Sequence, residues 1–148
     1  MQRLKTRSQF QAVLAGGTVA RTTHFALHRA GLDATLVEPP TSEPVRSATV
    51  VLFPTRAVWI GALVPKRWAR RAVTRNAIKR QIYSVSADFE SAFDVAAHLV
   101  RLRTAFDRKH FTSATSDLLK GAVRSELQQL FARAAAHRSS QAVAAGSP

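Results

Sequence analysis

Val58 to Val85 reads VWIGALVPKRWARRAVTRNAIKRQIYSV, and this stretch decides the fold. Residues 58–64 have the β-branched and aromatic composition of a strand, which Pro65 ends. From about Ala72 the apolar residues are spaced as on one face of a helix. These apolar residues are Ile78, Ile82, Val85 and Phe89. The stretch therefore predicts a strand, a short turn and a helix with one apolar face for the core.

Basic residues fill most of the remaining positions in and around this stretch. No Asp or Glu lies between Glu43 and Asp88. The basic residues in that interval are Arg46, Arg56, Lys66, Arg67, Arg70, Arg71, Arg75, Lys79 and Arg80. Like charges one helical turn apart destabilise a helix by roughly 0.2–0.5 kcal/mol per pair. A polyanionic partner would supply the missing negative charge, whereas solubility alone does not require the charges to be unmixed at one strand–helix junction.

The order of these elements resembles the signature of the bacterial ribonuclease P protein component. That family has a strand ending in a small residue and two basic residues, followed by a helix that reads Arg-Asn-Arg-x-Lys-Arg. Here Lys66-Arg67 follows the strand, and residues 75–80 read Arg-Asn-Ala-Ile-Lys-Arg. The sequence departs from the family at Ala77, where arginine is usual, and at Pro65, where serine is common. The change at Ala77 removes one RNA contact that the resemblance implies.

Composition agrees with a nucleic-acid partner. The chain has 148 residues, no cysteine, a formal net charge of +13 and a sequence pI near 11.7. This charge favours nucleic acid first and an anionic membrane second. No run approaches eighteen apolar residues, and MQRLKTRSQF lacks the apolar core of a signal peptide, so we expect a soluble cytoplasmic protein. The length predicts one domain with a core that needs no disulfides.

The N-terminal part predicts a helix and then a strand. Residues 6–9, Thr-Arg-Ser-Gln, have the form of a capping box, and Gly16-Gly17 ends the predicted helix at residues 7–15. Residues 24–30 alternate as a strand, with His24 and His28 expected at the surface or in a cleft. The resemblance implies that this helix and this strand line a cleft for single-stranded RNA. It implies leader-binding roles for Lys5, Arg7, Phe10 and Phe25, although an apolar core role for Phe10 is favoured by its position alone.

The remaining segments complete a single α+β domain. Residues 32–56, rich in proline and locally acidic, predict a peripheral insertion with a strand at 47–53. Residues 95–102 predict a buried strand, and Asp94 through Arg101 resembles an Asp, apolar run, Arg pattern of the family. Apolar steps from Leu119 predict a last helix to about Ala136, followed by a flexible tail at 137–148. We therefore predict residues 1–136 as helix, strands, basic helix, strand and helix, with a small mixed sheet and one basic face.

Groups for catalysis by the protein alone are not visible. The nine acids are scattered, and there is no Walker, Rossmann, HExxH or nucleophile-elbow motif, so we expect no catalytic residue and no metal site. The resemblance implies instead that a catalytic RNA subunit holds Mg²⁺ and cleaves precursor tRNA, with no protein partner required. It implies that the residues contacting this RNA are Lys66, Arg67, Arg70, Arg71, Arg75, Asn76, Lys79 and Arg80.

Two other functions fit a basic chain of this kind. The first is a binding protein with no enzymatic association, such as a ribosomal or nucleoid protein. The second is a membrane-surface protein, which the helix disfavours because its apolar stripe is needed for the core. Trp68, beside the basic turn, fits either cover for the sheet edge or stacking on RNA.

Overall fold

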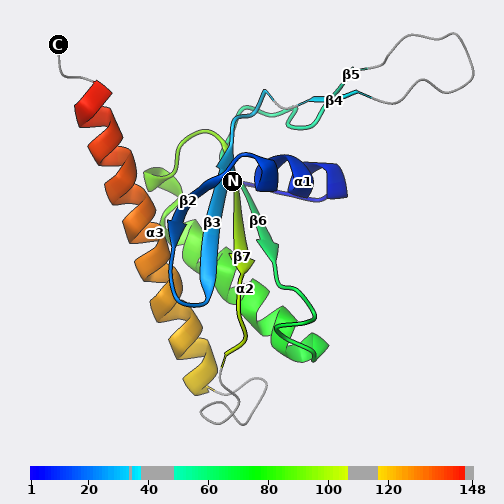
Figure 1. Ribbon diagram of the computed structural model, residues 1–148, viewed down its shortest axis with the longest axis vertical. Helices are drawn as coiled ribbons and strands as arrows, with labels where there is room; N and C mark the ends of the chain where they lie inside the picture. Colours follow the sequence, from blue (N-terminus) through cyan, green and yellow to red (C-terminus); the bar gives the residue numbers. More distant parts are fainter. Residues whose placement is uncertain (34, 38–48, 107–116, 146–148) are drawn as a thin grey trace, which may run out of the picture.

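A five-stranded mixed sheet forms the centre of the molecule, with α1 (Arg7–Ala15) on one face and α2 (Ala72–Asp88) and α3 (Asp117–Ala145) on the other (Figure 1). This computed structural model describes residues 1–33, 35–37, 49–106 and 117–145. The fold is α+β and keeps the predicted order of helix, strands, helix, strand and helix. The predicted fold class is therefore confirmed.

The sheet has the strand order β1-β6-β7-β3-β2. The strands are β1 (Gln2–Arg3), β2 (Thr18–Arg21), β3 (Phe25–Ala30), β6 (Trp59–Leu63) and β7 (Ala97–Leu102). β6 pairs in parallel with both β1 and β7, whereas β3 pairs antiparallel with both β7 and β2. The connection between the parallel neighbours β6 and β7 consists of α2 and then a short 3-10 helix, η1 (Glu90–Ala92). The decisive stretch thus supplies a central strand and its crossover helix.

The local signals at both helix starts act as the sequence predicts. Thr6 caps α1, because its Oγ1 accepts from the backbone N–H of Gln9 at 3.2 Å while the Gln9 Oε1 accepts from the N–H of Thr6 at 3.1 Å. α2 begins at Ala72, and Ile78, Ile82 and Val85 are buried. The capping box and the apolar stripe are both confirmed.

Two apolar layers hold the sheet between the helices. Toward α2 and α3 the core contains Phe25, Leu27, Ile60, Val100 and Leu102, together with the inner faces of both helices. Toward α1 the core contains Leu4, Val13, Trp59, Ala97 and Leu99. Alternate residues of each strand therefore face opposite layers, and both layers are apolar.

Gly61 permits the close packing of the N-terminal segment on the sheet. A Cβ built at Gly61 would lie 2.5 Å from Cδ1 of Leu4, which is buried over this position. No side chain fits there unless Leu4 moves. The glycine in the middle of β6 thus lets β1 and the following Leu4 lie close beside that strand.

Several boundaries differ from the sequence predictions. The predicted first strand is the third, because β1 has two residues and β2 has four with a largely exposed pattern, too little for a periodic signal. Within the predicted insertion, β4 (Thr35–Val37) and β5 (Thr49–Val51) pair as a separate two-stranded sheet. β5 covers the middle of the strand expected at 47–53, and residues 38–48 lie outside the described residues.

The C-terminal helix is longer than predicted. α3 continues to Ala145, so most of the expected tail at 137–148 is helical. The Ala content of residues 142–145 favours this continuation, since alanine has the highest intrinsic helix propensity. The cap candidates at 112–116 lie outside the described residues.

Candidate nucleic-acid interface

Seven basic side chains and one amide form a cation-rich segment in the turn after β6 and the first half of α2. The segment consists of Lys66, Arg67, Arg70, Arg71, Arg75, Asn76, Lys79 and Arg80. Lys79 and Arg75 are partly buried, and the other six are exposed. All eight residues that the resemblance implied as RNA contacts thus lie in one continuous turn and helix.

The start of α2 adds to the positive potential of this segment. Its N-cap residue is Arg71, which makes no side-chain capping hydrogen bond, and the first turn contains no acidic residue. Free backbone N–H groups and the helix dipole place partial positive charge at this end. The helix terminus and the side chains therefore both favour an anion at the same place.

The side chains of α2 lie in two rows that run along its outer surface. One row contains Arg75, Lys79 and Tyr83 at i, i+4 and i+8, and the other contains Asn76 and Arg80. Arg3 of β1 joins the first row from the sheet edge, where its guanidinium carbon lies 4.1 Å from the centroid of the Tyr83 ring. Sequence reasoning missed Arg3, because it reaches α2 only through the parallel pairing of β1 with β6.

Arg75 also holds the basic turn in place. Its Nη1 donates to the carbonyl oxygens of Ala69 at 3.0 Å and Arg70 at 2.8 Å. The Nε and Nη2 donors of the same guanidinium make no hydrogen bond within the described part of the chain. Arg75 can therefore fix the turn and contact an anion at the same time.

Trp68 lies in this turn and packs against the main core. Its side chain is partly buried, and the Arg67 guanidinium carbon lies 5.1 Å from the centroid of its ring. Of the two roles considered for Trp68, the packing supports cover for the sheet edge.

The described acidic side chains that have a basic partner find it outside the cation-rich segment. Asp88 pairs with Arg124 at 3.3 Å, Asp94 with Arg29 at 2.6 Å, and Glu126 with His24 at 2.7 Å. Glu90 pairs with the N-terminal ammonium at 2.8 Å. Among the described residues, no carboxylate pairs with a basic side chain of the cation-rich segment. The fold therefore leaves this segment without internal neutralisation.

A second surface lies on the sheet face that α1 partly covers. Phe10 of α1 is partly buried against the apolar layer there. Farther along the same face, Leu63 of β6 pairs with Arg101 of β7, and both are partly exposed. The cation-rich segment begins at Lys66, three residues after Leu63, so this surface and the cation-rich segment meet at the same end of the sheet. Sequence reasoning did not assign Arg101 to the site, although its place in the alternation after Ala97 and Leu99 puts it on this face.

The other predicted leader-binding residues have different environments. Lys5 and Arg7 are exposed at the start of α1. Phe25 is fully buried, with 0% exposure, and faces α2 and α3. The prediction that Phe25 stacks on RNA is therefore wrong for this structure, because the alternation that places it on one face of β3 does not reveal that helices cover that face.

The two histidines expected at the surface or in a cleft are more enclosed than surface residues. His28 is buried at 6% exposure, with its Nε2 accepting from the Nε of Arg101 at 3.2 Å. His24 is partly buried, stacks on Phe106 with ring centroids 4.0 Å apart, and contacts Glu126 through Nδ1 at 2.7 Å. Both side chains are thus tied into the structure by specific contacts.

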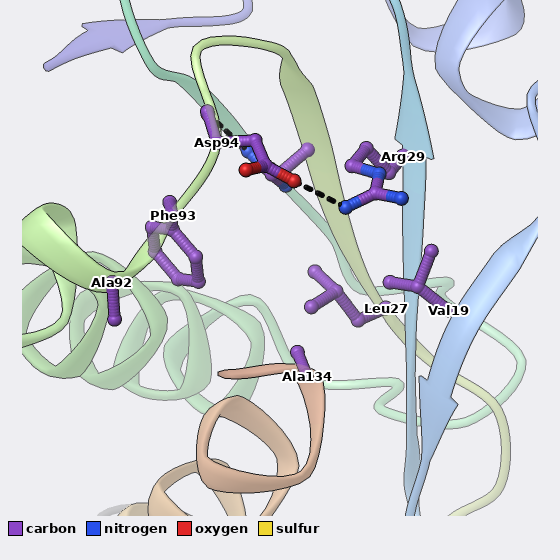
Figure 2. A pocket seen from close by; sticks show the side chains of 8 residues that line it. Val19, Leu27, Arg29, Ala92, Phe93, Asp94 and Ala134 are labelled. Atoms are coloured by element: carbon purple, nitrogen blue, oxygen red, sulfur yellow. Dashed lines mark hydrogen bonds and ion pairs between the residues drawn. The ribbon is translucent and has the colours of Figure 1, made fainter. Parts of the chain in front are cut away.

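His98 lines a small pocket between the sheet and α3 (Figure 2). It is 2% exposed, its Nε2 lies 3.1 Å from the carbonyl oxygen of Asp94, and its Nδ1 has no hydrogen-bond partner within the described residues. Burial lowers the pKa of His98 below its ordinary value of 6.5, while the Asp94 carbonyl acts in the opposite direction. The ion pair of Arg29 with Asp94 lies beside this pocket.

Two other kinds of site are absent from the described ranges. In residues 1–33, 35–37, 49–106 and 117–145, no three His, Asp or Glu side chains come together as metal ligands would. None of the helices in those ranges has the length and apolar character needed to cross a membrane.

Comparison with known proteins gives a consistent result. The family model described as Ribonuclease P matches residues 1–135. The ribonuclease P protein component of Bordetella parapertussis is 30% identical over 133 residues, which cover 90% of this chain and 91% of that relative. The Burkholderia mallei protein of the same name is 37% identical over 93 residues, covering 61% of this chain and 68% of the relative.

Solved structures of similar fold agree. The Staphylococcus aureus RNase P protein has a TM-score of 0.59 and 16% sequence identity, and the match covers 89% of this chain and 94% of that one. At this identity the likeness shows the fold alone. The family model and the curated relatives show which family the chain belongs to. This chain belongs to the ribonuclease P protein family.

Proposed function

We propose that this chain binds the catalytic RNA of ribonuclease P through the cation-rich segment and the 5′ leader of precursor tRNA through the sheet face beside α1. It would thereby assist endonucleolytic removal of the leader in the cytoplasm. As a ribonuclease P protein component, the chain is a subunit of a ribonucleoprotein endoribonuclease with an RNA subunit as its partner. The observation that carries the proposal is the cation-rich segment without carboxylate partners among the described residues.

The cation-rich segment suits phosphates of a folded RNA. Lys79 and Arg80 belong to the two neighbouring rows of α2, and the start of the helix adds backbone N–H donors. Each neutralised phosphate releases counterions and contributes a slope of about −0.7 to −0.9 in log K against log salt. Such contacts position a protein on RNA without reading its sequence. Ala77 leaves one helix position without the arginine that is usual in the family.

The surface beside α1 suits a single strand. Phe10 offers an aromatic ring, and a base stacked on such a ring gains about 1–3 kcal/mol regardless of its identity. Lys5 and Arg7 lie exposed before and at the start of the same helix, and Arg101 lies farther along the sheet face. A leader with varied sequence would be held by stacking and by phosphate contacts, which tolerate any base.

Chemistry at the scissile phosphate is assigned to the RNA subunit in this proposal. The Mg²⁺ ions are expected to reach the reaction through that RNA, and the described residues of the protein contain no cluster of three metal-ligating side chains. The protein contributes affinity for the substrate and its orientation toward the RNA.

Reconstitution tests the proposal. The full chain, mixed with its cognate ribonuclease P RNA at near-physiological Mg²⁺, should increase cleavage of precursor tRNA. The double variant Lys79→Ala/Arg80→Ala should lose much of this increase, while Lys120→Ala, which removes an exposed cation on α3, serves as the matched control. A wild-type chain that binds RNA but leaves cleavage unchanged would support the alternative, a basic RNA-binding protein associated with the ribosome or nucleoid. Binding to anionic vesicles in preference to RNA would support a membrane role.

A further inference from the structure

Arg101 on the sheet face beside α1 is held by a buried histidine. Its Nε donates to Nε2 of His28 at 3.2 Å, and the Nδ1 of His28 lies 3.3 Å from Oγ1 of Thr18. The three residues come from β7, β3 and β2, and Thr18 is the register partner of His28. They form a hydrogen-bonded row across neighbouring strands, which ends in the partly exposed Arg101.

The chemistry of arginine fixes the state of His28. A guanidinium has only donors, so the Nε2 that faces Arg101 must carry a lone pair. The imidazole is therefore neutral with its proton on Nδ1, from which it donates to Thr18. Protonation would place an N–H of His28 against the N–H of Arg101 and add a second positive charge, and both changes would break the contact.

We infer that His28, held by Thr18, is a positioning residue that fixes Arg101 to contact a phosphate of single-stranded RNA on the sheet face beside α1. This inference rests on the proposed leader-binding role of that face. The Nε bond to His28 occupies one edge of the guanidinium, while Nη1 and Nη2 remain for a bidentate contact. Ordering the arginine before binding removes part of the entropy cost of immobilising a long side chain.

The surroundings of His28 support a neutral imidazole. Burial lowers its pKa below 6.5, and the charges of Arg101 on β7 and Arg21 on β2 act in the same direction. The carbonyl of Gly17 acts in the opposite direction. α1 packs on this face, and its only ionisable residue is Arg7. Among the described residues, the charged groups that act on His28 are both arginines.

The test measures equilibrium binding of the reconstituted holoenzyme to uncleavable precursor tRNA with a long leader or with a single-nucleotide leader. Arg101→Ala should weaken binding of the long-leader substrate by about tenfold and leave the short-leader substrate nearly unchanged. His28→Phe keeps an aromatic ring but removes the acceptor, so it should weaken long-leader binding in the same direction. In the Arg101→Ala background, His28→Phe should have little further effect.

A second variant separates positioning from structure. His28→Gln places an amide oxygen where Nε2 lies, so it should restore long-leader binding. The wild-type holoenzyme should lose long-leader affinity when the pH falls through the pKa of His28, which burial places below the ordinary value of 6.5, whereas His28→Gln should not. A histidine acting simply as an added cation would instead raise affinity at low pH, and that result would overturn the inference.

The outcomes separate the leader-binding role from the role of His28. If the wild-type holoenzyme binds both substrates equally, the proposed leader-binding role fails, and the inference fails with it. If the wild type prefers the long leader but folded His28→Phe shows the same preference, only the inference about His28 fails. Circular dichroism spectra and melting temperatures of each variant establish which proteins are folded.

Discussion

The guanidinium carbon of Arg3 lies 4.1 Å from the centroid of the Tyr83 ring, which couples the edge strand β1 to the middle of α2. The ring covers one face of the guanidinium, and its N–H donors point outward from the edge of the guanidinium plane, where they can contact a phosphate. Arg3 thereby continues the row formed by Arg75 and Lys79, although it is more than seventy residues away in the sequence. The basic surface thus combines one residue of the edge strand β1 with residues of α2.

We predict that Arg3→Ala weakens binding of the ribonuclease P RNA severalfold and reduces the magnitude of its salt slope by about 0.7–0.9, the value for one phosphate contact. Tyr83→Ala should act in the same direction, because Arg3 loses its support. Tyr83→Phe keeps the ring and is the matched control. Filter binding over a series of salt concentrations measures all three, and an unchanged slope for Arg3→Ala would remove Arg3 from the interface.

The double variant Lys79→Ala/Arg80→Ala should lose two phosphate contacts. The magnitude of its salt slope should therefore fall by about 1.4–1.8. Its melting temperature should stay close to that of the wild type, because neither side chain has an ion-pair partner among the described residues. A large loss of thermal stability with unchanged RNA affinity would argue that these side chains serve the fold.

Arg75 should behave differently from its neighbours. Arg75→Lys keeps the charge but loses the two bonds from Nη1 to the Ala69 and Arg70 carbonyls, so we expect a stability loss of about 1 kcal/mol in chemical denaturation. Arg75→Ala should cost a similar amount of stability and also weaken RNA binding. Equal stability of Arg75→Lys and the wild type would show that the turn does not depend on these bonds.

Phe10→Ala should raise the Michaelis constant for precursor tRNA with a leader more than for a substrate with almost none. Phe10→Leu retains apolar volume against the layer on the α1 side of the sheet but lacks the aromatic ring, so it separates stacking from packing. If both variants affect the two substrates equally, Phe10 contributes packing alone. Single-turnover kinetics with the reconstituted enzyme provide the measurement.

Stability should fall as the pH drops below about 6.5, the ordinary pKa of histidine. The pKa values of His28 and His98 are lowered in the folded chain, so the unfolded chain takes up more protons in this range, and acid favours unfolding. Above about pH 6.5 neither group contributes a slope. Denaturant unfolding between pH 5 and 8 measures the effect, and His98→Phe should flatten the curve. An identical curve for this variant would exclude His98 as a source.

The parts of the fold that the sequence predicts are those with repeated local signals. The capping box sets the start of α1, and the stripe of Ile78, Ile82 and Val85 sets the inner face of α2. β1 and β2 carry no such signal, because a strand of two residues exists only through its pairing with β6. The sequence of residues 137–145 predicts a tail, because it shows no periodic apolar pattern that would mark a helix face.

The candidate interface divides in the same way. The spacing of Arg75 and Lys79 places them on one row of a helix, and sequence alone finds them. Arg3 belongs to the surface along α2, and Arg101 belongs to the sheet face beside α1. Both reach these places through strand pairing, which depends on the whole sheet. Phe10 and Phe25 look equivalent in the sequence, since each is an aromatic residue in an amphipathic element. In the structure α2 and α3 cover Phe25 completely, whereas Phe10 on α1 stays partly exposed.

The uncompensated charge of the cation-rich segment has opposite consequences for the free and the assembled protein. In the free chain the like charges of this segment repel one another, so added salt stabilises the fold by screening that repulsion. In the complex the same ions compete with the protein for phosphates. A concentrated salt buffer therefore suits storage of the isolated subunit, and gradual dilution in the presence of RNA is the natural route to assembly.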